Sequence, residues 1–175
     1  LGSGTIVDFE IEVDQETLIG TFNYTDPNYN FMGNSINYFL SSTSNDKPDQ
    51  GFENTVVSTG ARISFEQYKN LFTSLGLAAS YDDLRTVGTA SNSLKKQAGE
   101  FSELSANYGL KYDVRDRAFM PTRGGVFGFS QTIPLFADKS YISNSINASK
   151  YKTITENIIG SSKLFISTIN GLNDD

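Results

Sequence analysis

The chain has 175 residues, a length that predicts a single domain, and a formal net charge of −6. It contains no Cys and no His, which excludes a disulfide framework, Cys- or His-based metal sites and the commonest catalytic base. The acidic balance, without a basic stripe, makes nucleic acid a poor partner.

The hydrophobic content is modest for a chain so rich in aromatic residues. Hydrophobic residues make up 38% and aromatic residues 13%, and the mean hydropathy is −0.32. Transmembrane β-barrels combine these traits, because only alternate residues face lipid and aromatic residues gather at the two membrane interfaces. No apolar run approaches the roughly 20 residues that a membrane helix needs.

Strict alternation marks the first predicted strand, residues 5–13. One face is apolar and holds Val7, Phe9, Ile11 and Val13. The opposite face is an acidic row of Asp8, Glu10 and Glu12. In a soluble or surface β-sandwich that binds ligands, the acidic row would face solvent; in a barrel it would line the lumen. The alternation alone leaves both alternatives open.

The same pattern predicts further strands at residues 17–25, 34–43, 53–65, 69–82, 101–113, 126–134, 141–154 and 161–170. Short turns, including 14–16 and 66–68, alternate with longer loops, including 26–33, 44–51, 83–100 and 135–140. This is expected when one side of a barrel carries the tight turns. A short helix is predicted at residues 91–98, and the last two strands alternate too poorly for their faces to be assigned. The predicted fold is all-β, an antiparallel meander of about nine long strands.

No catalytic constellation is present, so we expect no enzyme activity and no cofactor or metal. The acidic row could hold calcium, but a solvated or lumen-lining face accounts for it better. Asp82-Asp83 and Asp174-Asp175 are interpreted as loop charges. The glycine pairs do not open a helix after a buried strand, which argues against phosphate binding.

The segment Tyr112–Gly125 packs five charges, one Pro and two Gly between alternating strands. Pro121 presets one turn dihedral, while Gly124 and Gly125 permit positive φ. Its motif residues are Tyr112, Asp113, Arg115, Asp116, Phe119, Pro121, Thr122 and Gly124. We expect Arg115 and Asp116 to organise the end of the strand.

This motif resembles the signature of the bacterial surface antigen family, the barrels of BamA- and TamA-type outer-membrane assembly proteins, and is most like the BamA type. Residues 1–4 and 25–29 resemble two further turns of these barrels. The resemblance implies that residues 1–175 are a partial barrel domain, strands three to eleven of a sixteen-stranded transmembrane β-barrel. The POTRA domains and the C-terminal strands would be absent. Residues 83–100 would be an extracellular loop, and the 113–125 turn would face the periplasm.

The resemblance also implies a function, namely folding and inserting β-barrel proteins into the bacterial outer membrane. The implied partners are unfolded outer-membrane clients, outer-membrane lipids and the lipoproteins of an assembly complex. A TamA-like or polypeptide-exporting barrel of the same superfamily is the alternative within this class.

Overall fold

The computed structural model describes residues 4–30, 32–138 and 140–172. They form one nine-stranded antiparallel sheet in which every strand pairs with its neighbours in sequence. The strands are β1 (Ile6–Val13), β2 (Thr17–Asp26), β3 (Ser35–Lys47), β4 (Phe52–Tyr68), β5 (Leu71–Thr86), β6 (Gly99–Asp113), β7 (Gly124–Ala137), β8 (Tyr141–Thr155) and β9 (Ile158–Gly171). The predicted all-β meander of nine strands is confirmed. Of the residues 1–4 that resemble a barrel turn, only Gly4 lies within the described ranges. The charges Asp174-Asp175 lie outside them.

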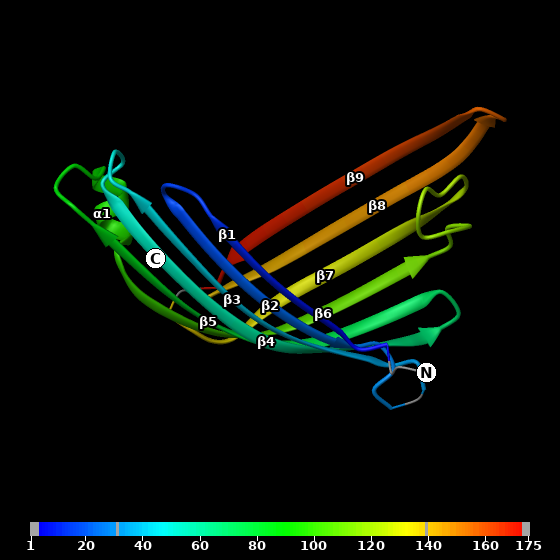
Figure 1. Cartoon of the computed structure of the whole chain (residues 1–175), viewed down its shortest axis with the longest axis horizontal. Coiled ribbons are helices and arrows are strands. Elements are labelled where there is room, and N and C mark those ends of the chain that lie inside the picture. Colours follow the sequence, from blue (N-terminus) through cyan, green and yellow to red (C-terminus); the bar gives the residue numbers. More distant parts are fainter. Residues whose placement is uncertain (1–3, 31, 139, 173–175) are drawn as a thin grey trace.

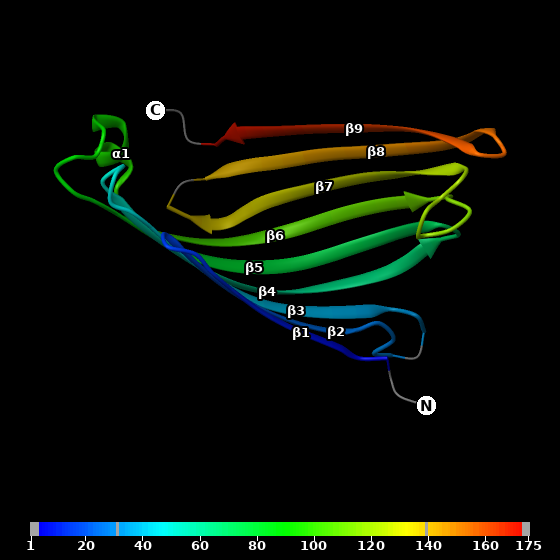
Figure 2. The same cartoon turned by 45° about the horizontal axis from the view of Figure 1, so that its top comes forward.

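The sheet bends into an open trough, with the strands side by side from β1 to β9 (Figures 1 and 2). The strands are long, reaching 17 residues in β4 and 16 in β5, which exceeds the 9–11 or so needed to cross a bilayer. No second sheet packs on this one in the described part of the chain. The β-sandwich alternative is therefore wrong, because a sandwich needs two packed sheets.

The sheet has almost no interior of its own. Among the described residues, Ala90 is the only apolar residue that is buried. None of the described helices is long and apolar enough to span a membrane. Folding of this chain therefore cannot rely on a conventional packed core, and its main-chain ladders carry most of the order.

Long and short connections occur at both ends of the sheet. Residues 14–16 and 87–98 lie at the end that carries the helix α1 (Asn92–Gln97), whereas residues 69–70 and 114–123 lie at the other (Figure 1). The expectation that one end carries the tight turns is therefore wrong for this chain. The predicted helix is confirmed, and the Ser91 hydroxyl caps it by accepting a hydrogen bond from the Leu94 amide at 3.2 Å.

Several strands extend beyond their predicted ends. Strand β3 continues to Lys47 through residues predicted as a loop, and β4 continues to Tyr68 through a predicted turn. The chain reverses instead at Asn70, which has a φ of 66°. Main-chain pairing continues past the apolar positions because the ladder needs no particular side chain.

Candidate functional site

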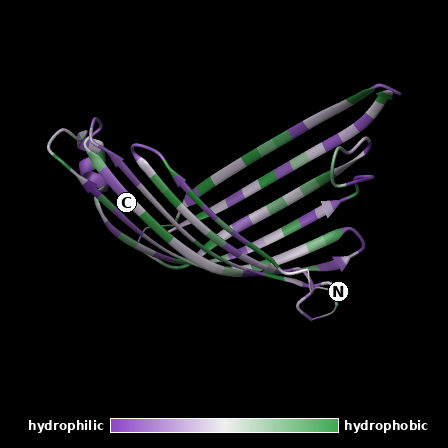
Figure 3. Cartoon of the chain, viewed as in Figure 1, coloured by the Kyte–Doolittle hydropathy of each residue, from purple (hydrophilic) through white to green (hydrophobic). Residues whose placement is uncertain are grey.

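The cross-strand register joins the apolar side chains of successive strands into one surface. Phe9 lies opposite Phe22, which lies opposite Leu40, and Ile63, Leu75 and Tyr108 are aligned in the same way. We call this surface the apolar face; it includes Val7, Phe9, Ile11, Val13, Phe22, Tyr38, Leu40, Ile63, Leu75, Leu77, Leu104, Tyr108, Phe127, Phe129, Ile133, Ile146, Leu164 and Ile166. Figure 3 shows the corresponding hydrophobic bands alternating with hydrophilic ones along the strands.

The apolar face is exposed. Phe9 is 69% exposed, Val7 59% and Leu77 54%, and many others on this face are similarly uncovered. A water-soluble monomer rarely exposes so large a continuous apolar surface. The face therefore fits contact with the hydrocarbon of a bilayer.

The opposite, polar face is held together by side-chain hydrogen bonds. The hydroxyls of Ser41 and Ser58 are 2.7 Å apart, and those of Ser130 and Ser145 are also 2.7 Å apart. Some positions on this face have no room for a side chain, since a Cβ on Gly60 would lie 2.6 Å from the Phe39 ring. The side chains of this face are therefore closely packed around Gly60.

The acidic row lies on the polar face of β1. Asp8 is opposite Asn23, Glu10 opposite Thr21 and Glu12 opposite Ile19, and all three carboxylates are exposed. Successive members are two residues apart along the strand, a spacing of roughly 6.8 Å between their Cα atoms. No cluster of three or more acidic residues suited to a metal occurs among the described residues.

Asp116 organises the 114–123 turn. Its carboxylate accepts hydrogen bonds from the Thr122 amide at 3.0 Å, the Arg123 amide at 3.2 Å and the Thr122 hydroxyl at 2.6 Å. The hydrogen bond from the Thr122 hydroxyl is the main cause that lowers the pKa of Asp116 from its usual 3.8 to about 2. Desolvation acts in the opposite direction, and the hydrogen bonds from the two amides lower the pKa further. Asp116 therefore replaces the ladder partners that these amides lack in the turn.

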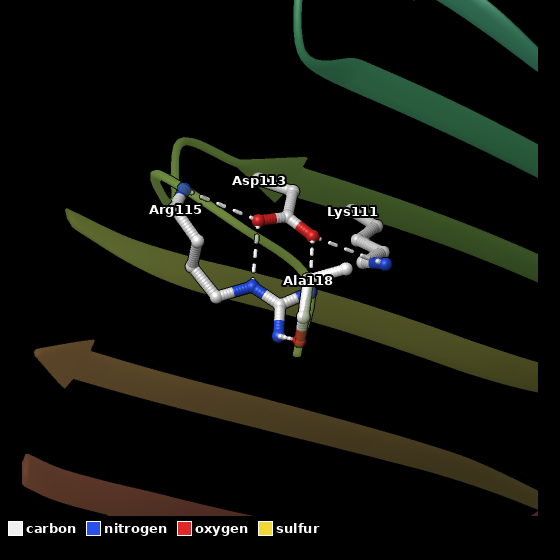
Figure 4. Close-up of polar contacts among 4 residues, drawn as sticks. All are labelled: Lys111, Asp113, Arg115 and Ala118. Atoms are coloured by element: carbon white, nitrogen blue, oxygen red, sulfur yellow. Dashed lines mark hydrogen bonds and ion pairs between the residues drawn. The ribbon is translucent and has the colours of Figure 1, made fainter. Parts of the chain in front are cut away.

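Arg115 holds the end of β6. Its Nε and Nη2 atoms donate to the two carboxylate oxygens of Asp113 at 2.8 and 2.6 Å, and Nη1 donates to the Ala118 carbonyl at 3.3 Å (Figure 4). Lys111 approaches the same carboxylate at 3.3 Å. This bidentate geometry joins the strand end to the turn tip. Sequence reasoning missed Lys111 because a polar residue on a polar strand face gives no distinguishing signal.

The two glycines of the turn have different roles. Gly124 has a φ of 90°, and a Cβ there would overlap the Val114 carbonyl oxygen and lie 2.9 Å from Arg115 Cα. Gly125 is not among the positive-φ residues, so of these two glycines only Gly124 uses the positive φ that glycine permits. Its constraint is space, because a Cβ there would lie 2.7 Å from the Ser149 carbonyl oxygen.

The remaining motif side chains do not join this network. Phe119 and Met120 at the turn tip are 81% and 67% exposed, and Tyr112 points from the apolar face with 45% exposed. The turn is therefore held by the polar contacts of Asp113, Arg115 and Asp116, and it exposes apolar side chains at its tip.

Comparisons with known proteins bear on the whole sheet. A family model described as "Omp85 superfamily domain" matches residues 1–175. The chain is similar in structure to BamA from Haemophilus ducreyi lacking POTRA domains 1–3, with a TM-score of 0.73 and 18% identity over 95% of this chain. At that identity the likeness shows the fold. The match spans 36% of that chain, so this sequence covers about a third of it. No curated protein matches the chain.

Proposed function

The chain belongs to the Omp85 superfamily, and from that premise we propose that it forms part of the wall of a barrel that folds and inserts other β-barrel proteins. It is a piece of a bacterial outer-membrane β-barrel. The observation that carries the proposal is the family match over residues 1–175, on a single bent sheet whose apolar face is uncovered.

In this proposal the two faces have distinct environments, and residues 1–175 belong to one barrel domain. The apolar face contacts lipid, and the polar face with Asp8, Glu10 and Glu12 lines the lumen. The 114–123 turn faces the periplasm, and the connection that carries α1 lies outside the cell. The hydrogen-bonded serines and the tight glycine contacts on the polar face support this inside-out assignment.

The proposed activity needs no covalent chemistry, nucleotide or cofactor. A barrel can offer an unpaired strand edge to a client, which then pairs through main-chain hydrogen bonds. A locally thinned bilayer lowers the cost of inserting the client. Unfolded outer-membrane proteins, outer-membrane lipids and assembly-complex lipoproteins are the proposed partners. The present chain contributes a rigid wall, lumen charge and lipid contact.

A reconstitution experiment tests the proposal. The full-length protein is inserted into liposomes, a urea-denatured β-barrel client is added, and its folding is followed by its heat-modifiable mobility on gels. Folding should be faster than in liposomes without the protein. An unchanged rate would contradict the assembly function. Delivery of the client into the lumen of the liposome, instead of into its membrane, would favour the polypeptide-exporting alternative.

A further inference from the structure

An apolar hollow lies on the apolar face beside the 114–123 turn. It has a volume of about 400 Å³, and its walls include Tyr112, Val114 and Phe127. These three side chains are 45%, 40% and 45% exposed. Gly125 forms part of the floor and leaves it open, because it has no side chain. The hollow thus offers apolar walls at the border between the apolar face and the charged turn.

Two lysines lie at the same border. Lys150 lines the hollow, and Lys152 follows two residues later on the same face of β8. The register places Gly125 and Ser162 beside Lys150, and Gly160 beside Lys152, so no carboxylate is directly opposite either ammonium group. Neither lysine takes part in an ion pair among the described residues.

The other end of the apolar face has the opposite charge character. Glu53 lies opposite Arg85, and Asp83 lies opposite Glu100, so carboxylates outnumber cations there. The chain as a whole is also acidic, with a net charge of −6. The exposed lysines without an ion-pair partner, Lys150 and Lys152, are therefore a local feature of the end of the apolar face beside the 114–123 turn.

We propose that this hollow binds an anionic glycerophospholipid, with one acyl chain against Tyr112, Val114 and Phe127 and the phosphate near Lys150 and Lys152. The inference rests on the proposed embedding of the apolar face in a membrane. A lipid uses both the apolar walls and the charges, whereas free phosphate would leave the walls uncovered. Each Lys near a membrane surface attracts anionic lipid headgroups.

The size of the effect follows from the two charges. Each lysine near an anionic membrane surface is expected to contribute about fivefold in lipid affinity. Together, Lys150 and Lys152 should favour phosphatidylglycerol over phosphatidylcholine by about 25-fold at low salt, and the preference should fall as salt rises.

The test uses the full-length protein purified in detergent with an equimolar mixture of phosphatidylglycerol and phosphatidylcholine. Native mass spectrometry measures the ratio of the two lipids retained. The double variant Lys150→Gln and Lys152→Gln should lose most of the preference. The matched control is Lys163→Gln, because Lys163 lies opposite Ser149 on the polar face of the adjacent strand β9. This control should keep the preference within about twofold.

A second variant, Val114→Trp, fills the hollow without changing charge and should lower retention of both lipids. Equal lipid ratios for the wild type and the double variant, or equal losses in the double variant and in Lys163→Gln, would overturn the inference. The same preparations are assayed for heat-modifiable mobility and for client folding. A wild-type protein that retains phosphatidylglycerol but does not fold clients would contradict the proposed function alone, whereas normal client folding without lipid preference would overturn only the lipid site.

Discussion

Replacing Phe9 with Arg tests which face of the sheet meets lipid. Phe9 is 69% exposed on the apolar face, opposite Phe22, while the adjacent Glu10 points to the polar face opposite Thr21. We expect Phe9→Arg to destabilise the folded barrel strongly. The same Arg placed one residue later, as Glu10→Arg, should be tolerated, because it would face a wet lumen beside acidic neighbours.

The magnitude follows from the position of Phe9 along β1. Phe9 is the fourth of eight residues in this strand. At a rise of about 3.4 Å per residue and a tilt of about 40°, it lies roughly 8–10 Å in height from either strand end. That places it near the middle of an apolar band about 25 Å tall, where Arg costs about 2–4 kcal/mol. The folding equilibrium should fall by between about 30- and 700-fold.

The assay is a urea titration of the full-length protein in phospholipid vesicles, with folding read from heat-modifiable mobility. Glu10→Gln, which changes neither face nor size greatly, and Phe9→Leu serve as mild controls. Equal midpoints for Phe9→Arg and Glu10→Arg would refute the assignment of the apolar face to lipid. A larger loss for Glu10→Arg would reverse it.

Two further predictions concern the 114–123 turn. Gly124→Ala should lower the free energy of unfolding by about 1–3 kcal/mol, because both the φ of 90° at Gly124 and its closeness to Val114 oppose a Cβ. The control is Gly20→Ala, whose added Cβ would meet nothing within 4 Å and should be nearly neutral in the same urea titration. Equal effects of the two substitutions would contradict the argument. Because the pKa of Asp116 is lowered to about 2, its stabilisation of the turn is complete above about pH 4 and is lost as the pH falls through about 2. Hydrogen exchange of the Thr122 amide, corrected for its intrinsic pH dependence, should show this loss in the wild type. In Asp116→Ala the Thr122 amide should be unprotected at every pH. Protection that persists in Asp116→Ala would refute the role of this carboxylate.

Alternation predicted the number and order of the strands because most strands carry apolar side chains on one face and polar side chains on the other. It failed at the strand ends. Residues 44–47 are polar on both faces, yet they pair with β4. Lys47 also forms an ion pair with Glu16, which lies in the connection between β1 and β2. Beyond the apolar face the two faces no longer differ in polarity, so hydropathy cannot report a strand that main-chain bonds still hold.

The faces of β8 and β9 could not be predicted from sequence for a related reason. Phe165 and Ile169 are apolar residues on the polar face, so both faces of β9 carry hydrophobic side chains. Only the register decides, since Ile166 lies opposite Ile146 and Leu164 opposite Ala148.

The turn was recognisable from its Pro, Gly and charged residues, but its internal bonding was not. Its sequence offers Asp113 and Asp116 as acceptors and three arginines as donors. In the structure Arg115 pairs with Asp113, while Asp116 bonds Thr122 and the Arg123 amide. Sequence spacing cannot select among these pairings, because the selection depends on the backbone path that Gly124 permits.

The geometry of the sheet limits where strand templating can occur in the proposed mechanism. Strands β2 to β8 are each paired on both sides, and β4 and β5 pair almost without interruption from Phe52 to Tyr68. Opening any of these ladders would break a continuous row of main-chain bonds at once, as well as polar-face bonds such as that between Ser41 and Ser58. Among the described strands, only β1 and β9 lack a neighbouring strand along one whole edge. A closed barrel pairs such edges with further strands. In the proposed mechanism a client-accepting seam would therefore lie outside β2–β8, and β2–β8 would act as the fixed wall against which the seam opens.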